Sequence, residues 1–207
     1  MDYAGDPSRT EDSIMKKIIK NNRGFTLIEL MLVITILGVT ISLAAPPMSD
    51  FLKRYQAEAQ RQKLFDLIAL SRSKAYGHGQ IYTLCGSADR QTCSGTWADG
   101  ALFFADTDGN GSRTSDEEIE RVMEPLPDGA SLTWSSFGNK PYLQFRPNGL
   151  TPNQSGNFSY CPPDGNEQYG WIIVLNAMGR PYYGRDNDGD GRAENGSGEN
   201  LNCPTTV

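Results

Sequence analysis

The longest apolar segment of the chain runs from Phe25 to Ala45 and contains one charged residue, Glu29. A helix of these 21 residues would be about 30 Å long, which matches the hydrocarbon core of a bilayer. The segment therefore predicts a membrane-spanning helix. A carboxylate inside hydrocarbon is costly unless it is paired, so Glu29 requires a positively charged partner.

Two prolines, Pro46 and Pro47, follow the span and predict a kink, because proline removes a backbone donor and clashes with the preceding turn. Apolar residues then recur at helical spacing to about Tyr76, where a glycine-rich stop ends the helix. We expect this amphipathic helix to dock its apolar face on a globular domain. The face comprises Met48, Phe51, Leu52, Tyr55, Ala59, Leu64, Leu67, Ile68 and Ala75.

Beyond Gly79 the pattern changes to short alternating runs separated by Gly, Pro, Asn and Asp, which indicate strands and turns. One long helix followed by strands predicts an α+β fold, in which the helix covers one face of an antiparallel sheet. The expected parts of the chain are residues 1–24, the span at 25–47 and one domain at 48–207. The expected strands are 80–85, 101–105, 118–123, 130–136, 142–146, 157–160, 170–175 and 180–183.

A cluster of positive charges, Lys16, Lys17, Lys20 and Arg23, lies just ahead of the span. By the positive-inside rule this side of the membrane is cytoplasmic. We therefore expect a single-pass protein of the inner membrane whose carboxy-terminal domain lies in the periplasm.

The six residues GFTLIE at positions 24–29 resemble the processing site of type IV prepilins and type II secretion pseudopilins. The resemblance implies cleavage after Gly24 by a membrane-embedded prepilin peptidase and N-methylation of Phe25. Glu29 would then pair with the amine of a mature amino terminus during assembly. A start at Met15 would give the same mature protein. The alternative is an ordinary signal anchor with a chance glutamate.

A second pattern is scattered over residues 80–180 and comprises Leu84-Cys85, Cys93, Trp97, Gly100, Phe104, Asp106, Glu118, Phe145 to Gly149, Tyr160-Cys161, Ile172 to Val174 and Gly179-Arg180. Together these residues resemble the GspH/FimT/FimU family of minor pilins and pseudopilins. The resemblance implies a low-copy structural subunit near a filament tip, with other pilins or pseudopilins as partners. Three functions stay open: a type IV minor pilin, a GspH-like type II secretion pseudopilin, and a pilus-tip DNA receptor.

The net charge of −6 gives the chain no general attraction to nucleic acid phosphates. Its four cysteines suit an oxidising compartment, and their spacing, with one histidine, fits no zinc site. We expect two disulfides, Cys85–Cys93 and Cys161–Cys203. That histidine, His78, lies in the glycine stop, so no catalytic base is evident and we assign no catalytic residues.

Residues 106–117 fit the D-x-[DN]-x-[DN]-G-x5-E calcium loop at every specified position. Calcium is the only cofactor that a motif indicates, although such runs also form ordinary turns without metal. The expected ligands are Asp106, Asp108, Asn110, Ser112, Thr114 and Glu117.

A second acidic run repeats the first half of this pattern but has Ser197 where the last glutamate should stand. Its expected ligands are Asp186, Asp188, Asp190 and Glu194, with Glu199 as another closing residue. The alternative is a solvated loop tethered by Cys203.

The segment from Gly179 to Arg185 lies where DNA-uptake members of the family carry a Gly-Arg-x-Arg motif. Here Tyr182 replaces the second arginine. Arg180 and Arg185 could contact phosphates, but the neighbouring acidic loop opposes a polyanion. DNA is therefore the least favoured partner.

Overall fold

The computed structural model describes residues 24–204, without the side chains of residues 44–47. The predicted leader and its basic cluster lie outside the described residues, apart from Gly24. The chain divides between Ser49 and Asp50 into two compact units, which are described separately below.

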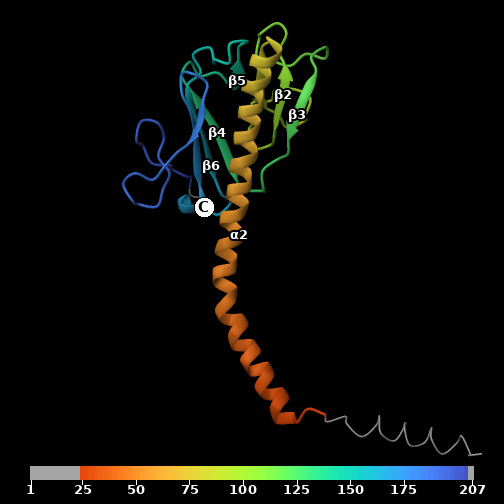
Figure 1. The fold of residues 1–207 in the computed structure, drawn as a ribbon, viewed down its shortest axis with the longest axis vertical. Coiled ribbons are helices and arrows are strands. Elements are labelled where there is room, and N and C mark those ends of the chain that lie inside the picture. Colours follow the sequence, from red (N-terminus) through yellow and green to blue (C-terminus); the bar gives the residue numbers. More distant parts are fainter. Residues whose placement is uncertain (1–23, 205–207) are drawn as a thin grey trace, which may run out of the picture. The chain divides into compact units, whose positions relative to one another are not determined.

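Helix α2, Leu27–His78, begins in the first unit and ends in the second (Figure 1). Its end falls two residues beyond the expected one, where the Gly79 amide donates to the carbonyl of Ala75 at 3.1 Å and Gly79 adopts φ +65°. By length and hydropathy, no single helix among the described residues qualifies as a membrane span, whereas the segments Leu27–Leu43 and Met48–His78 qualify when taken together.

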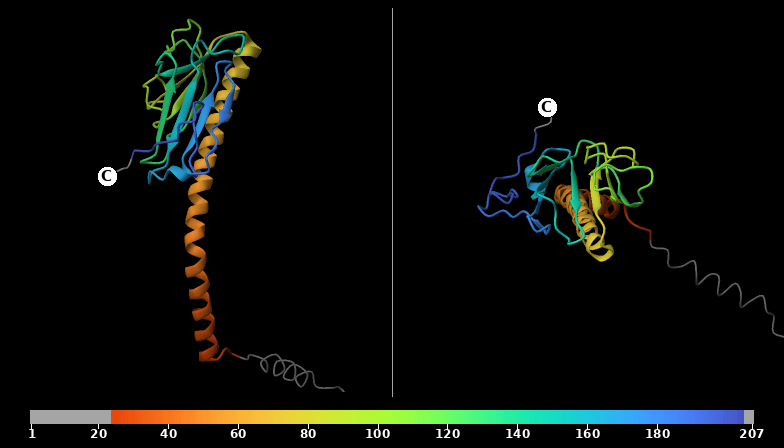
Figure 2. Two further views of the ribbon diagram at one scale, coloured as in Figure 1. Left: turned by 90° about the vertical axis from the view of Figure 1, so that its left-hand side faces the viewer. Right: turned by 90° about the horizontal axis from the view of Figure 1, so that it is seen from above.

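The second unit contains two antiparallel sheets of four strands each (Figures 1 and 2). Each expected strand is present, but sequence analysis anticipated one sheet. The first sheet has the order β3-β2-β1-β5, and its strands are β1 Tyr82–Gly86, β2 Ala101–Ala105, β3 Ile119–Met123 and β5 Tyr142–Phe145. The second has the order β4-β6-β7-β8, and its strands are β4 Ser131–Ser136, β6 Gly156–Cys161, β7 Trp171–Leu175 and β8 Pro181–Tyr183, with a short 3-10 helix at Glu167–Tyr169.

The core lies between the sheets and the part of α2 beyond Ala57 (Figure 2). Leu64 and Ile68 of the helix are fully buried. Fully burying each such side chain contributes about 1.5–3 kcal/mol. The indole Nε1 of Trp171 donates to the carbonyl oxygen of Ala57 at 2.9 Å, and the Trp171 ring stacks on Tyr160. The helix is therefore fixed to the second sheet by a buried hydrogen bond as well as by apolar packing.

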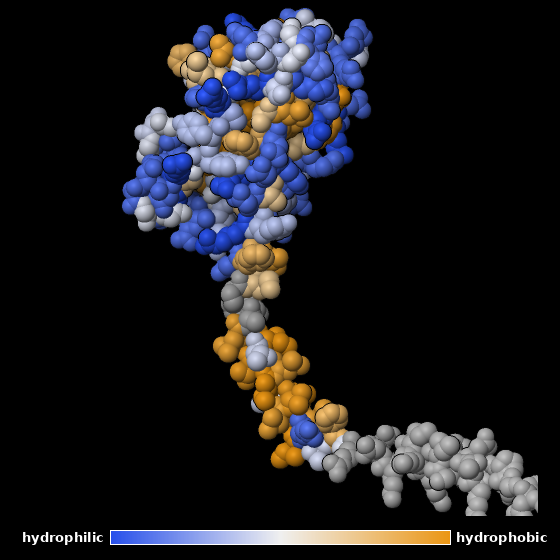
Figure 3. All heavy atoms as spheres, viewed as in Figure 1, coloured by the Kyte–Doolittle hydropathy of each residue, from blue (hydrophilic) through white to orange (hydrophobic). Residues whose placement is uncertain are grey.

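The first part of the expected docking face is exposed. Phe51 is 62% exposed and Tyr55 is 64% exposed, and Met48 and Leu52 are exposed as well. The expectation that docking begins at Met48 is wrong, because the first helical side chain buried in the core is that of Ala57. Figure 3 shows the apolar surface that the amino-terminal part of the helix presents.

Candidate functional site

The helix start is built around Thr26 and Glu29. The Glu29 amide donates to Thr26 Oγ1 at 3.3 Å, and the Leu30 amide donates to the Thr26 carbonyl at 3.1 Å. Thr26 is thus the helix N-cap, in the Thr-x-x-Glu pattern of a capping box. Sequence analysis assigned Thr26 no role, although this local pattern signals one. None of the ion pairs within residues 24–204 includes Glu29.

The segment from Leu27 to Leu43 exposes its apolar side chains and satisfies its polar ones internally. At its two ends, Leu27 is 77% exposed and Leu43 is 74% exposed. The hydroxyls of Thr35, Thr40 and Ser42 each donate to a backbone carbonyl three or four residues earlier. A helix that presents apolar groups and leaves no hydroxyl unbonded suits a lipid or protein surrounding.

Both cysteine pairs occur as disulfides in the combination expected from the sequence. Cys85 of β1 is bonded to Cys93 in the following loop, with Cα atoms 5.5 Å apart. Cys161 at the end of β6 is bonded to Cys203 in the tail, with Cα atoms 5.6 Å apart. The second bond attaches the tail to the sheet.

The first acidic loop, residues 106–117, joins β2 to β3 and contains two buried carboxylates, those of Asp106 and Glu117. Glu117 accepts from the amides of Thr107 and Thr114 at 2.8 and 2.9 Å. One carboxylate oxygen each of Asp106, Asp108 and Glu117 lies within 4.8 Å of the other two. The structure thus gathers three of the predicted ligands at one point.

Two polar residues outside the motif hold Asp106. Thr83 Oγ1 and Gln144 Nε2 donate to its Oδ2 atom at 2.6 and 2.8 Å, and the Gly111 amide donates to the same atom at 3.0 Å. Thr83 and Gln144 are cross-strand partners on β1 and β5. Sequence analysis missed both residues, because strand pairing across 61 positions leaves no local signal.

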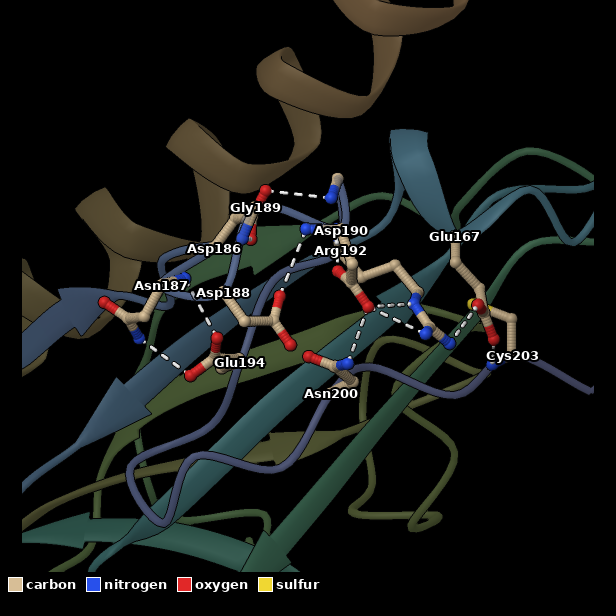
Figure 4. Close-up of polar contacts among 11 residues, drawn as sticks. Glu167, Asp186, Asn187, Asp188, Gly189, Asp190, Arg192, Glu194, Asn200 and Cys203 are labelled. Carbon is tan, nitrogen blue, oxygen red and sulfur yellow. Dashed lines mark hydrogen bonds and ion pairs between the residues drawn. The ribbon is translucent and has the colours of Figure 1, made fainter.

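The second acidic loop is organised by its own hydrogen bonds (Figure 4). The two oxygens of Asp186 accept from the amides of Gly189 and Gly191 at 2.7 and 2.8 Å. Glu194 accepts from the side chain and the backbone amide of Asn187, and these bonds lower the pKa of Glu194. One oxygen each of Asp186, Asp188 and Glu194 lies within 4.8 Å of the other two.

Asp190, the remaining ligand predicted in this loop, lies in a different network (Figure 4). The backbone amide and the guanidinium of Arg192 donate to its carboxylate and lower its pKa. Arg192 also pairs with Glu167 at 3.1 Å, and Glu167 accepts from the Cys203 amide at 3.0 Å. Asp190 thus helps to hold the tail and is absent from the three-carboxylate cluster.

The arginines considered for DNA contact are both exposed. Arg185 lines a groove of about 620 Å³ together with Tyr182 and Glu194, and Arg180 is not part of its lining. The carboxylate of Glu194 opposes phosphate binding in this groove.

Comparisons with known proteins identify relatives of both parts of the chain. Residues 60–179 match the family model described as type II transport protein GspH, and residues 19–45 match the prokaryotic N-terminal methylation motif. No curated protein sequence matches the chain significantly.

Two solved structures illustrate the likeness of fold. The type IV minor pilin FimU of Pseudomonas aeruginosa is 16% identical with a TM-score of 0.52, and the alignment covers 65% of this chain and 92% of that chain. The minor pseudopilin EpsH from the type 2 secretion system of Vibrio cholerae is 16% identical with a TM-score of 0.46, covering 62% and 95% respectively. The FimU likeness shows that the helix and two sheets form a fold known from solved structures.

Proposed function

Because the chain belongs to the GspH family, whose model matches more than half of it, we propose that it is a minor pilin that helps to initiate a type IV pilus near its tip. The family is structural, and a subunit role in a pilus or pseudopilus follows from membership. FimU, a type IV minor pilin, favours the pilus. The description of the family model, type II transport, favours a GspH-like pseudopilin as the second candidate.

The observation that carries this proposal is that apolar side chains of α2 are exposed both within the segment that could lie in lipid and beyond it. Leu27 to Leu43 is long enough for most of a bilayer, and Phe51 and Tyr55 remain exposed beyond it. An apolar surface of this kind marks an interaction site. We infer that residues 25–47 lie in the inner membrane before assembly and that the helix then packs among the helices of neighbouring subunits.

Cleavage of the leader would create the amino terminus that takes part in assembly. The match to the methylation motif supports cleavage after Gly24 and N-methylation of Phe25 by a prepilin peptidase. Residues 1–24 would be the leader, and residues 48–207 would form the domain on the periplasmic side. The new amine would lie at the positive end of the helix dipole, which disfavours a second positive charge there. The carboxylate of Glu29, from this subunit or a neighbour, offsets that charge and so favours docking.

The proposal can be tested in a strain whose own copy of the gene is deleted. Glu29→Val should be cleaved normally but should be absent from sheared filaments, because an amine inside the bundle loses its partner. Gly24→Ser should remain uncleaved. Thr35→Val is the matched control, since its hydroxyl bonds only within the helix, and it should be cleaved and incorporated normally. The readouts are amino-terminal sequence by mass spectrometry and immunoblots of the filament fraction.

Normal incorporation of Glu29→Val would contradict the charge pairing, and a mature species starting at Phe25 in Gly24→Ser would contradict the processing site. Loss of twitching motility in the deletion strain, with secretion intact, is expected for a minor pilin. Loss of secretion alone would replace the pilus with the type II secretion pseudopilus.

A further inference from the structure

We propose that the loop between β2 and β3, residues 106–117, binds one calcium ion through its buried carboxylates. This role is separate from filament initiation and does not depend on it. The motif alone does not establish the site, because runs of Asp, Asn and Gly also form turns without metal. The case rests on the state of one buried atom.

That atom is Asp106 Oδ1. The Asp106 side chain is 0% exposed, and three donors share its other oxygen, Oδ2. Among the residues that the structure describes, none donates a hydrogen bond to Oδ1 itself. A buried carboxylate oxygen without a partner is destabilising, since it has lost water and gained nothing in exchange. The same carboxylate contributes an oxygen to the cluster with Asp108 and Glu117, so a cation there would be its missing partner.

The charges around the loop support a cation. Glu117 is 3% exposed, and its oxygens accept only from amides and a hydroxyl of the loop. None of the ion pairs within residues 24–204 includes Asp106, Asp108 or Glu117. Arg113 directs its Nε and Nη1 atoms to the backbone carbonyls of Glu117 and Gln91 instead. Three carboxylates within 4.8 Å of one another repel unless a cation or proton neutralises them.

The available donors match calcium in number and kind. The side chains of Asp106, Asp108 and Glu117 supply hard anionic oxygens, the Asn110 amide and the Ser112 carbonyl add neutral ones, and Thr114 can hold a water. Calcium accepts six to eight oxygens in irregular geometry, whereas magnesium demands a near-ideal octahedron. A carboxylate-rich loop whose donors include side chains, a backbone carbonyl and a water therefore favours calcium.

The backbone of the loop is held in shape by Gly111. This residue adopts φ +80°, and a Cβ atom placed on it would lie 2.2 Å from the ring of Tyr142. Only glycine fits there, and its amide donates to Asp106 Oδ2 at 3.0 Å. The turn thus leaves Oδ1 as the oxygen that is free for an ion.

The second acidic loop provides a natural comparison, because no carboxylate oxygen of its cluster is both buried and without a hydrogen-bond partner among the described residues. Asp186 is exposed and both of its oxygens accept backbone amides, whereas Asp190 is held by Arg192 outside the cluster. We therefore assign the ion to the first loop alone.

The test uses the full chain in detergent, first stripped with a chelator and then titrated with calcium chloride by calorimetry. Melting temperature is measured in calcium and in chelator. The wild type should bind one ion and melt at a higher temperature in calcium, because the unfolded chain cannot hold the ligands together. Asp106→Asn and Glu117→Gln should each abolish both effects. Magnesium chloride in place of calcium should give a smaller shift.

Two charge-matched controls separate the site from general electrostatics. Asp116→Asn removes an exposed charge of the same loop that no ligand position uses, and Asp186→Asn changes the first position of the second loop. Both should retain one bound ion and the full melting shift. The proposal is overturned if the wild type has the same melting temperature in calcium and in chelator. It is also overturned if Asp116→Asn reduces calcium binding as much as Asp106→Asn does, or if Asp186→Asn abolishes calcium binding. If the Asp106 variant does not fold in chelator by circular dichroism, Glu117→Gln decides.

Discussion

Removing the disulfide between Cys161 and Cys203 tests how far the tail depends on a covalent bond. The bond spans a sequence separation of 42, whereas Cys85–Cys93 spans 8. In the chain-entropy model, closing these loops lowers the entropy of the unfolded chain by amounts equivalent to about 4 and about 2.5 kcal/mol. We expect the double alanine variant of the long-range pair to lose about 1.5 kcal/mol more than that of the short-range pair.

Alanine is the appropriate replacement because Cys161 and Cys203 are each 6% exposed, and a serine hydroxyl there would lack water. Other contacts keep the tail near the sheet in the variant. Leu201 packs in a cluster with Ile172 and Val174, and the Cys203 amide still donates to Glu167. The variant should therefore fold. The difference in free energy of unfolding between variant and wild type should then arise mainly from the greater entropy of its unfolded chain.

The measurement is urea denaturation of residues 50–207, a fragment that contains all three apolar clusters of the described chain. Tryptophan fluorescence follows unfolding, since Trp171 and Trp97 are buried, and linear extrapolation gives the free energy of unfolding. The loop-length argument would be refuted if the two double variants lost equal free energy of unfolding, or if the variant of the short-range pair lost more.

In the same fragment, Leu64→Ala should lower the free energy of unfolding by about 2.7–5 kcal/mol because Leu64 is fully buried, whereas Leu52→Ala, on an exposed turn of the same helix, should change it by less than about 0.5 kcal/mol. Similar losses would contradict the assigned docking face. The Lys74 ammonium, 2.9 Å from Glu120, lowers the pKa of Glu120 below its ordinary value of 4.5 in the folded state. The resulting stability is present above pH 4.5 and is lost as pH falls through the lower folded pKa, so the wild type should lose more stability than Glu120→Gln when the pH is lowered below 4.5. Parallel pH profiles in urea would contradict that coupling.

The sequence predicted the elements of the fold because their signals are local. Alternating apolar residues and turn formers placed all eight strands, and the glycine at 79 placed the helix end within two residues. The division into two sheets depends on pairings such as Thr83 with Gln144, which no local pattern encodes. Periodicity also could not distinguish the stretch of the helix that is buried in the domain from the stretch that stays exposed, because the residues of both stretches are apolar. Docking therefore begins at Ala57 and not at Met48.

The candidate site was predictable in part for the same reason. Spacing alone identified two acidic loops as potential calcium sites. The only difference that it showed between them was the last motif position, which is Glu117 in the first loop and Ser197 in the second. The two loops differ in the environment of their first aspartate: Asp106 is buried and accepts hydrogen bonds from Thr83 and Gln144, whereas Asp186 is exposed. Burial of this kind arises from tertiary packing, so only the folded chain reveals it.

The bond between Cys161 and Cys203 also determines how the subunit would respond to a pulling force. The sequence separation of 42 between these cysteines would correspond to about 150 Å if the chain were drawn out fully. The bond removes that length from the extensible chain. A load applied to the tail therefore passes directly to the end of β6, and β7, β8 and the second acidic loop are bypassed. Tension would thus be transmitted through β6 without first unfolding the residues between the two cysteines.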